Sequence, residues 1–413
     1  MKGKIFFSVI LSAILLTACN SGGTDVTDSP ADNAPAESTE TTAETEIVPE
    51  TTTTAATSEA AEETATTAAE TIPSKIENFG GDVELDFQTV DIGGILPDDD
   101  NYIRLFILSD TAALGTSGGE GDILFFDLNE PKLKGKVSSP EGWKFNWYYD
   151  LIEGSGDILC TAGLYRYNDE GQTNYAALVV RRDFSAEVVE DGYEKALAMP
   201  AGSHNISVLY DIIDADSGAV LVEGVEDNSP SGFGNMSVWY DYKFAIDGDR
   251  FVYRACGIER MPGFGYYDFI NGAAVDFPES RNFMPIGYHD GKIYAEETEW
   301  DGMCQGKLCT FDVETLKSEV FIPQNENSEN SAIMFTEYTM SPDGSFIIAN
   351  DFDGSGMNIL RIISPDSGDT LVRCELNFGG SYGSDFTFID DGRFAAFGDY
   401  TGEIVIFDVK MQY

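Results

Sequence analysis

The stretch from Ser384 to Lys410, SDFTFIDDGRFAAFGDYTGEIVIFDVK, places the strongest constraint on the fold of this chain. It alternates strand-like runs with short turns in which Asp and Gly supply the conformations that antiparallel connections need. A looser copy runs from Ile107 to Asn129, where Ala112-Ala113-Leu114-Gly115 matches Ala395-Ala396-Phe397-Gly398. Two copies far apart in one chain indicate an architecture built from repeated supersecondary units.

The segment from Glu337 to Asn377 predicts one complete unit, a four-stranded antiparallel meander of the kind that forms a propeller blade. This unit begins near Ser331, and other units begin near Asn101, Gly142, His204, Asn282 and Ser381. Six intervals between the first and the last of these starts would average about 47 residues, within the range of about 40 to 50 that blades occupy. We therefore predict an all-β fold, a seven-bladed β-propeller, with six blades as the alternative.

The last unit ends soon after Asp408 and lacks an outer strand, whereas residues 82–90, DVELDFQTV, form a strand-like run with no partner. A ring whose last blade takes its outer strand from the N-terminal side leaves no open edge at that point. We therefore predict that Val83–Val90 pairs with Glu403–Lys410.

The tetrapeptide Ser341-Pro342-Asp343-Gly344, followed by an apolar strand, resembles the repeats of bacterial TolB-type and WD40-like propellers. The strand pattern extends this resemblance over most of residues 80–413. It implies the propeller fold, and it implies a binding platform, because such families share a fold and differ in function.

The N-terminus carries a targeting signal. Lys2 and Lys4 precede a short apolar run, which is followed by Leu16-Thr17-Ala18-Cys19. These four residues resemble the lipobox of bacterial lipoproteins, which implies cleavage before Cys19, a diacylglyceryl group on its thiol, and anchorage on the extracytoplasmic side of the cell membrane. The predicted organisation is a signal peptide (1–18), an acidic, disordered tether rich in Thr, Ala and Glu (19–75) and a propeller (76–413).

Charge and cysteine content narrow the function classes further. The net charge of −48 argues against nucleic acid as a partner, because phosphates would be repelled. Cys160, Cys256 and Cys374 lie in apolar strand patterns and are expected in the core. Cys304 and Cys309 are close enough in sequence for a local bridge in an oxidising compartment, and their state is left open.

Acidic and aromatic residues at predicted loops are the candidate ligand-binding groups. A ring of carboxylates at a channel mouth could bind a cation or a basic ligand, or could hold an acid–base pair for glycoside chemistry, and Trp300 could stack on a sugar. The alternative is a solvated acidic surface. The candidates are Glu296, Glu297, Trp300, Asp301, Asp399 and Tyr400.

The residues that could form a metal site or a catalytic site do not make a complete motif. Asp351 and Asp353 begin a run that resembles the start of a calcium loop, but the distant Glu is missing, so we expect no cofactor and keep calcium as the alternative. His204 is predicted just before a first strand, and His289 in a turn between first and second strands. These positions would place the two histidines on opposite faces, where they could not share a catalytic site.

Together these features predict a membrane-anchored, extracytoplasmic binding or scaffold module of propeller type, with the membrane and an unknown protein or glycan as partners. No catalytic residues are assigned. The alternative is a propeller hydrolase or lyase that acts on carbohydrate through channel-mouth carboxylates.

Overall fold

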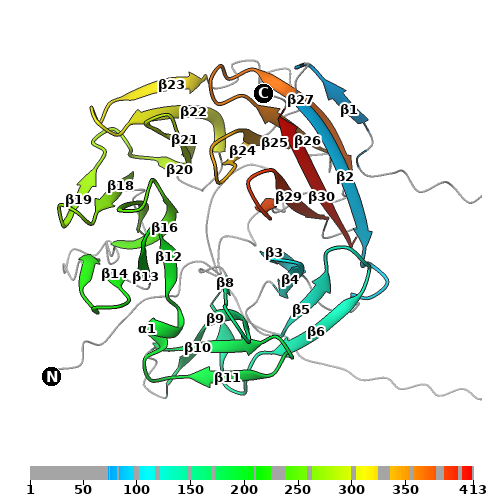
Figure 1. Cartoon of the computed structure of the whole chain (residues 1–413), viewed down its shortest axis with the longest axis vertical. Helices are drawn as coiled ribbons and strands as arrows, with labels where there is room; N and C mark the ends of the chain where they lie inside the picture. Colours follow the sequence, from blue (N-terminus) through cyan, green and yellow to red (C-terminus); the bar gives the residue numbers. More distant parts are fainter. Residues whose placement is uncertain are drawn as a thin grey trace, which may run out of the picture. The chain divides into compact units, whose positions relative to one another are not determined.

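Four-stranded antiparallel sheets succeed one another around a ring, as Figure 1 shows for the computed structural model of the chain. The structure describes residues 73, 75–80, 83–96, 102–116, 121–146, 151–168, 173–208, 211–224, 238–257, 263–298, 304–323, 335–352, 357–377, 386–398 and 402–411. The sheets make up the blades of a seven-bladed β-propeller, with two neighbouring blades joined into one nine-stranded sheet, which confirms the predicted fold class and blade number.

The first three blades occupy residues 102–222. Blade 1 contains β3 (Tyr102–Leu108), β4 (Thr111–Thr116), β5 (Asp122–Asp127) and β6 (Leu133–Ser138). Blade 2 contains β7 (Lys144–Phe145) and β8 (Ile152–Glu153), which both pair with β9 (Ile158–Tyr167), then β10 (Thr173–Arg181) and β11 (Ala186–Val189). Helix α1 (Tyr193–Ala196) leads to blade 3, which contains β12 (Met199–Ala201), β13 (His204–Val208), β14 (Ile212–Asp214) and β15 (Val220–Val222).

The remaining blades follow the same order, from an inner first strand to an outer fourth strand. Blade 4 contains β16 (Val238–Ala245), β17 (Arg250–Gly257), β18 (Gly263–Asp268) and β19 (Ala273–Asp276). Blade 5 contains β20 (Phe283–His289), β21 (Lys292–Thr298), β22 (Cys304–Asp312) and β23 (Ser318–Ile322). Blade 6 contains β24 (Phe335–Met340), β25 (Ile347–Phe352), β26 (Met357–Ile363) and β27 (Thr370–Asn377). Blade 7 contains β28 (Phe386–Phe388), β29 (Arg393–Gly398) and β30 (Glu403–Met411).

Two strands from the N-terminal side complete the last blades. β2 (Val83–Asp91) pairs antiparallel with β30, from Val83 opposite Met411 to Asp91 opposite Glu403, which confirms the predicted ring closure. β1 (Lys75–Asn78), which the sequence analysis did not predict, adds a fifth strand to blade 6 by pairing with β27. The chain thus crosses from the edge of blade 6 to the edge of blade 7 before it enters blade 1 (Figure 1).

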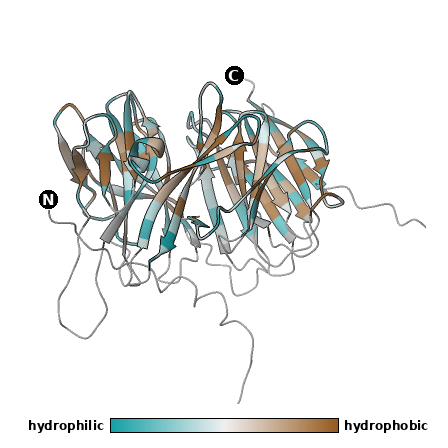
Figure 2. Cartoon of the chain, turned by 90° about the horizontal axis from the view of Figure 1, so that it is seen from below, coloured by the Kyte–Doolittle hydropathy of each residue, from teal (hydrophilic) through white to brown (hydrophobic). Residues whose placement is uncertain are grey.

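The core lies between the blades, because each sheet buries both faces against its neighbours. Figure 2 shows the apolar residues concentrated within the strands. Between blades 6 and 7, for example, Phe394 and Phe407 stack with ring centroids 4.8 Å apart beside the buried Leu360. Blades 2 and 3 are bridged by α1, where the Ser207 hydroxyl donates to the carbonyl of Glu194. None of the described helices is long and apolar enough to cross a membrane.

The turn at Ser341–Gly344, which carries the family resemblance, is fixed by its own side chains. Asp343 accepts the N–H of Ser345 at 2.9 Å, and the Ser341 hydroxyl accepts the N–H of Phe346 at 3.1 Å. Gly344 has φ +73°, and a Cβ at this position would lie 2.4 Å from the carbonyl oxygen of Tyr288 in blade 5. The glycine is therefore required both by the turn and by the close packing of two blades.

Aspartates at several turns accept backbone N–H groups, and this lowers their pKa values. In Asp312, hydrogen bonds from the backbone and hydroxyl of Thr315 lower the pKa, and in Asp268 the bonds from Asn271 do the same. A carboxyl whose pKa is lower in the folded chain stabilises that state above its ordinary pKa, near pH 4, and loses the effect as the pH falls further.

The Asp312→Asn variant tests this pH dependence. The difference in free energy of unfolding between the natural chain and the variant should be largest above about pH 5 and should shrink as the pH falls below 4. Urea unfolding at a series of pH values measures it. A difference that stays constant over this range would show that the Asp312 carboxylate does not contribute through its charge.

Two of the three cysteines expected in the core are fully buried, and the third is partly buried. Cys160 and Cys374 have no exposed surface, and burial raises the pKa of each thiol to about 12. Cys256 donates to Asp241 at 3.3 Å. Cys309 is a free, buried thiol in the core between blades 4 and 5, and the side chain of Cys304 lies outside the described residues.

Candidate functional site

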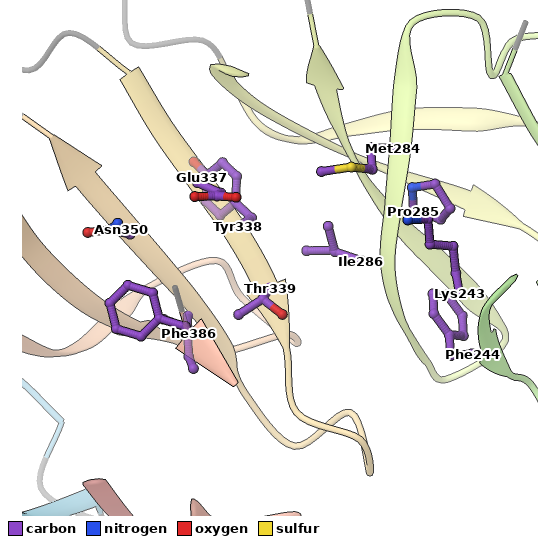
Figure 3. A pocket seen from close by; sticks show the side chains of 11 residues that line it. Lys243, Phe244, Met284, Pro285, Ile286, Glu337, Tyr338, Thr339, Asn350 and Phe386 are labelled. Carbon is purple, nitrogen blue, oxygen red and sulfur yellow. The ribbon is translucent and has the colours of Figure 1, made fainter. Parts of the chain in front are cut away.

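A cavity of about 290 Å³ lies where the inner strands of blades 4 to 7 come together (Figure 3). Its wall is formed by the first strands β16, β20, β24 and β28, with β25 behind β24. First strands of a propeller face the central channel, so we name this space the channel-wall cavity. Its lining is polar and apolar in about equal parts.

The apolar part of the lining comes from four strands. The lining includes Phe244 of β16, Met284 and Ile286 of β20, Ile348 of β25 and Phe386 of β28. Thioether and aromatic groups of this kind pack well against flat or irregular apolar ligands. β20 shifts register between Pro285 and Gly287, which bends the strand at the wall of the cavity.

Asn350 is the most unusual residue of the cavity. It lies in β25 opposite Glu337 and Leu360, and its side chain is only 1% exposed. Neither polar atom of its amide, Nδ2 or Oδ1, has a hydrogen-bond partner among the described residues. A buried polar group without a partner costs about 1–3 kcal/mol, so Asn350 lowers the stability of blade 6.

Charged residues at the cavity have opposite signs. Lys243 and Glu337 line it on opposite sides of Ile286, as Figure 3 shows. The Lys243 ammonium lies 3.9 Å from the Asp241 carboxylate. The cavity walls therefore carry little net charge, although the chain as a whole is strongly acidic.

Tyr338 fixes the part of the cavity wall that β24 forms. Its N–H donates to Glu296 Oε2 at 2.9 Å, and its hydroxyl donates to the carbonyl of Gly306 at 2.9 Å. Burial raises the pKa of its phenol to about 12, so it stays neutral at physiological pH. These bonds connect blade 6 to blade 5 and fix the position of β24.

The predicted ligand-binding carboxylates of blade 5 lie in a strand and not in a loop. Glu296 and Glu297 are inside β21, and the Glu296 side chain is completely buried, where it accepts the N–H of Tyr338. The Glu297 carboxylate lies 3.2 Å from the ammonium of Lys307. The sequence pattern had predicted that this strand ends before Glu296. A ligand-binding role for Glu296 and Glu297 stays a prediction.

Asp351, predicted as a calcium ligand, is also inside a strand. It lies in β25 and is 3% exposed. Arg361 donates from Nε to Oδ2 at 2.6 Å and from Nη2 to Oδ1 at 2.9 Å, and Thr336 donates to Oδ1 at 2.7 Å. Both carboxylate oxygens are thus bound to neighbouring strands of blade 6.

The other predicted site residues lie outside the described residues. They are Cys19, Trp300, Asp301, Asp353, Asp399 and Tyr400. Groups of three or more potential metal ligands do not occur among the residues that the structure describes.

The two histidines do not lie on opposite faces, contrary to the sequence-based expectation. His204 begins β13, which is the second strand of blade 3, because β12 precedes it. His204 and His289 therefore flank equivalent turns between first and second strands. His204 contacts Asp249 at 3.2 Å and His289 contacts Asp366 at 3.1 Å, so each imidazole links its blade to the next one.

Asn350 was missed by the sequence analysis, although a signal is present. The run Phe346-Ile347-Ile348-Ala349-Asn350 is apolar until its last residue, and an Asn at a buried strand position needs a partner. The other residues of the cavity carry no such signal, because they are ordinary members of the inner strands.

Comparisons with known proteins concern the fold alone. No family model and no curated protein sequence matches the chain. Solved structures similar to it include BamB from Moraxella catarrhalis (TM-score 0.39, 12% identity, covering 78% of this chain and 98% of that one) and the WD40 repeats of RRP9 (0.44, 7%, 81% and 100%). Raptor from Chaetomium thermophilum is also similar (0.46, 13%), and the match covers 78% of this chain but 28% of the Raptor chain. The fold is established by the seven blades of the chain itself.

Proposed function

We propose that the protein is a ligand-binding propeller held at the extracytoplasmic side of a cell membrane by a lipid on Cys19. The observation that carries the binding function is the channel-wall cavity, which residues from four neighbouring blades line. The signal-like residues before Cys19 and the acidic segment that follows support the anchored location. The partner is a small molecule, a protein or a glycan.

The cavity favours binding over catalysis. Of the described residues predicted for acid–base chemistry, Glu296 is buried and accepts the N–H of Tyr338, and Glu297 is paired with Lys307. A general acid or base has to reach the substrate, and these carboxylates face other parts of the protein. The same contacts stabilise the wall of the cavity, which suits a preformed binding site.

The anchor is tested by replacing Cys19 with alanine. The natural chain should be found in the membrane fraction and should incorporate labelled fatty acid in growing cells, whereas the variant should lose the label. A Cys19→Ala chain that still carries the label would rule out Cys19 as the lipidation site. Labelling is the primary measurement, because an uncleaved signal segment could retain the variant at the membrane.

Ligand binding is tested by thermal unfolding of the full chain in detergent, with a panel of divalent cations, glycans and small metabolites. A ligand at about 100 times its dissociation constant should add roughly 2.7 kcal/mol to the free energy of unfolding. Ile286→Trp, which fills the cavity, is the matched control. A ligand that stabilises both chains equally binds elsewhere, which would contradict the proposed cavity function.

A further inference from the structure

The strand that closes the ring leaves a long edge uncovered. β2 is the last strand of its sheet, on the outside of the ring (Figure 1), and none of the described strands pairs with its outer side. Its nine residues pair with β30 without a bulge or a shift of register. A regular, uncovered edge of this length is a template for pairing with another extended chain.

The backbone groups that face outward from β2 follow from one hydrogen bond. The N–H of Ile92 donates to the carbonyl of Gly402 at 2.8 Å, in the same register as the pairing of β2 with β30. Hydrogen-bonded and non-hydrogen-bonded residues alternate along an antiparallel pair. Because Val83, Leu85 and Phe87 are an odd number of residues from Ile92, they direct their N–H and C=O groups away from β30.

β2 lacks the features that protect the other described outer strands from pairing. β6 carries Lys134 and Lys136, and β1 carries Lys75. β11, β15 and β19 have no more than four residues each, and β23 has five. β2 is longer than all of these and contains neither proline nor a basic residue. Among the described outer strands, its edge is the one to which a further strand can add most readily.

The side chains of β2 indicate what kind of strand would add. On one face Phe87 is 42% exposed beside the half-buried Leu85, and on the other face Glu84 and Asp86 are exposed. Asp86 is paired with Lys410, whereas Glu84 has no ion pair among the described residues. A complementary strand therefore places apolar side chains on the first face and basic side chains on the second.

The chain itself does not supply such a strand. Residues 20–74, which precede the propeller, contain no Lys or Arg, so they offer no basic partner to Glu84. A second copy would bring a net charge of −48 against an equal charge, and the two would repel each other. The complementary charge has to come from another protein.

We propose that the outer edge of β2 binds an extended segment of a partner protein, in which basic and apolar side chains alternate, as an added antiparallel strand of blade 7. Main-chain hydrogen bonds to Leu85 and Phe87 provide the affinity, and Glu84 and Asp86 select the basic side chains. No residue of β2 lines the channel-wall cavity, so this inference does not depend on ligand binding there.

The test uses a dye-labelled seven-residue peptide in which valine and lysine alternate, with the full chain in detergent and fluorescence anisotropy as the measurement. We expect a dissociation constant of about 100 μM. Binding should weaken as the salt concentration rises, because exposed charges are then screened. The same peptide with glutamate in place of lysine should bind at least about tenfold more weakly, because it places like charges opposite Glu84.

Methylation of the peptide backbone separates strand addition from general attraction to an acidic protein. In an antiparallel pair the valines lie opposite Leu85 and Phe87, so their N–H groups point toward β2 and those of the lysines point away. N-methylation of the valines should therefore abolish binding. N-methylation of the lysines, which keeps the same composition and charge, should leave most of the affinity.

Two substitutions of Phe87 test the edge from the protein side. Phe87→Pro removes an outward N–H and no hydrogen bond to β30, so it should weaken peptide binding at least about tenfold while the urea midpoint changes little. Phe87→Thr, which keeps the N–H, is the matched control and should cost less than about threefold. Ile286→Trp, which fills the channel-wall cavity, should leave peptide binding unchanged.

Several results would overturn the inference. These are the absence of binding by the valine–lysine peptide, equal binding of the two N-methylated peptides, and equal binding by the natural and Phe87→Pro chains. Equal binding of the lysine and glutamate peptides would contradict the choice of a basic segment. A dimer of the natural chain that Phe87→Pro dissociates, found by analytical ultracentrifugation in the absence of peptide binding, would assign the edge to a second copy instead.

Discussion

Replacing Asp351 with alanine is expected to lower the free energy of unfolding by about 3–5 kcal/mol, because it leaves a largely buried guanidinium without its partner. Arg361 makes two hydrogen bonds to this carboxylate, and Thr336 makes a third. The bidentate geometry joins β25 to β26, and the threonine joins both to the inner strand β24. Urea unfolding at neutral pH measures the loss.

The double variant Asp351→Leu with Arg361→Met is the informative control. An apolar pair of similar volume removes both buried charges together, so most of the lost stability should return. Asp366→Ala, which removes an exposed carboxylate from the contact with His289, should change the free energy of unfolding by less than about 1 kcal/mol. If Asp351→Ala costs no more than Asp366→Ala, the ion pair does not stabilise blade 6.

Replacing Val90 with aspartate should open the ring and lower the free energy of unfolding by about 3–5 kcal/mol. Val90 lies in β2, is only 2% exposed and packs in the cluster between blades 7 and 1 with Leu114 and Ile404. An unpaired carboxylate at this position cannot be solvated unless β2 separates from β30. Thermal or urea unfolding gives the stability, and proteolysis of the N-terminal segment reports the separation of β2.

Phe87→Asp provides the comparison on the same strand. Phe87 is 42% exposed, so the same introduced charge stays in water and should cost no more than about 1 kcal/mol. Equal losses for the two variants would mean that β2 does not hold the ring closed through its buried face.

The fold could be predicted from the sequence because its signals are local and repeated. The turns at Asp390–Gly392 and Ser341–Gly344 mark the blades, and the unpaired run of residues 82–90 indicated the closure that β2 and β30 make. β1 was missed because Lys75–Asn78 is short and mostly polar, so only its pairing with β27 reveals it. His204 was misplaced because β12 is only three residues long and contains a proline.

The candidate site could not be predicted in the same way. Its lining comes from four blades that are distant in sequence, and only the closed ring brings Lys243, Ile286 and Phe386 together. Glu296 and Asp351 were predicted as site residues because they are charged. Both are buried, because the strand register, which the local sequence pattern does not fix, turns them away from solvent.

The pairing of β2 with β30 also sets the order in which the molecule can be completed. About 300 residues separate the two strands, so at about 5–20 residues per second roughly 15–60 s pass between the synthesis of β2 and that of its partner. Blades 1 to 6 can form during this interval, but blade 7 cannot, and the apolar side chains of β2 stay uncovered throughout. Maturation therefore ends in a single late closing step, and until then β2 is the segment that a chaperone would have to protect.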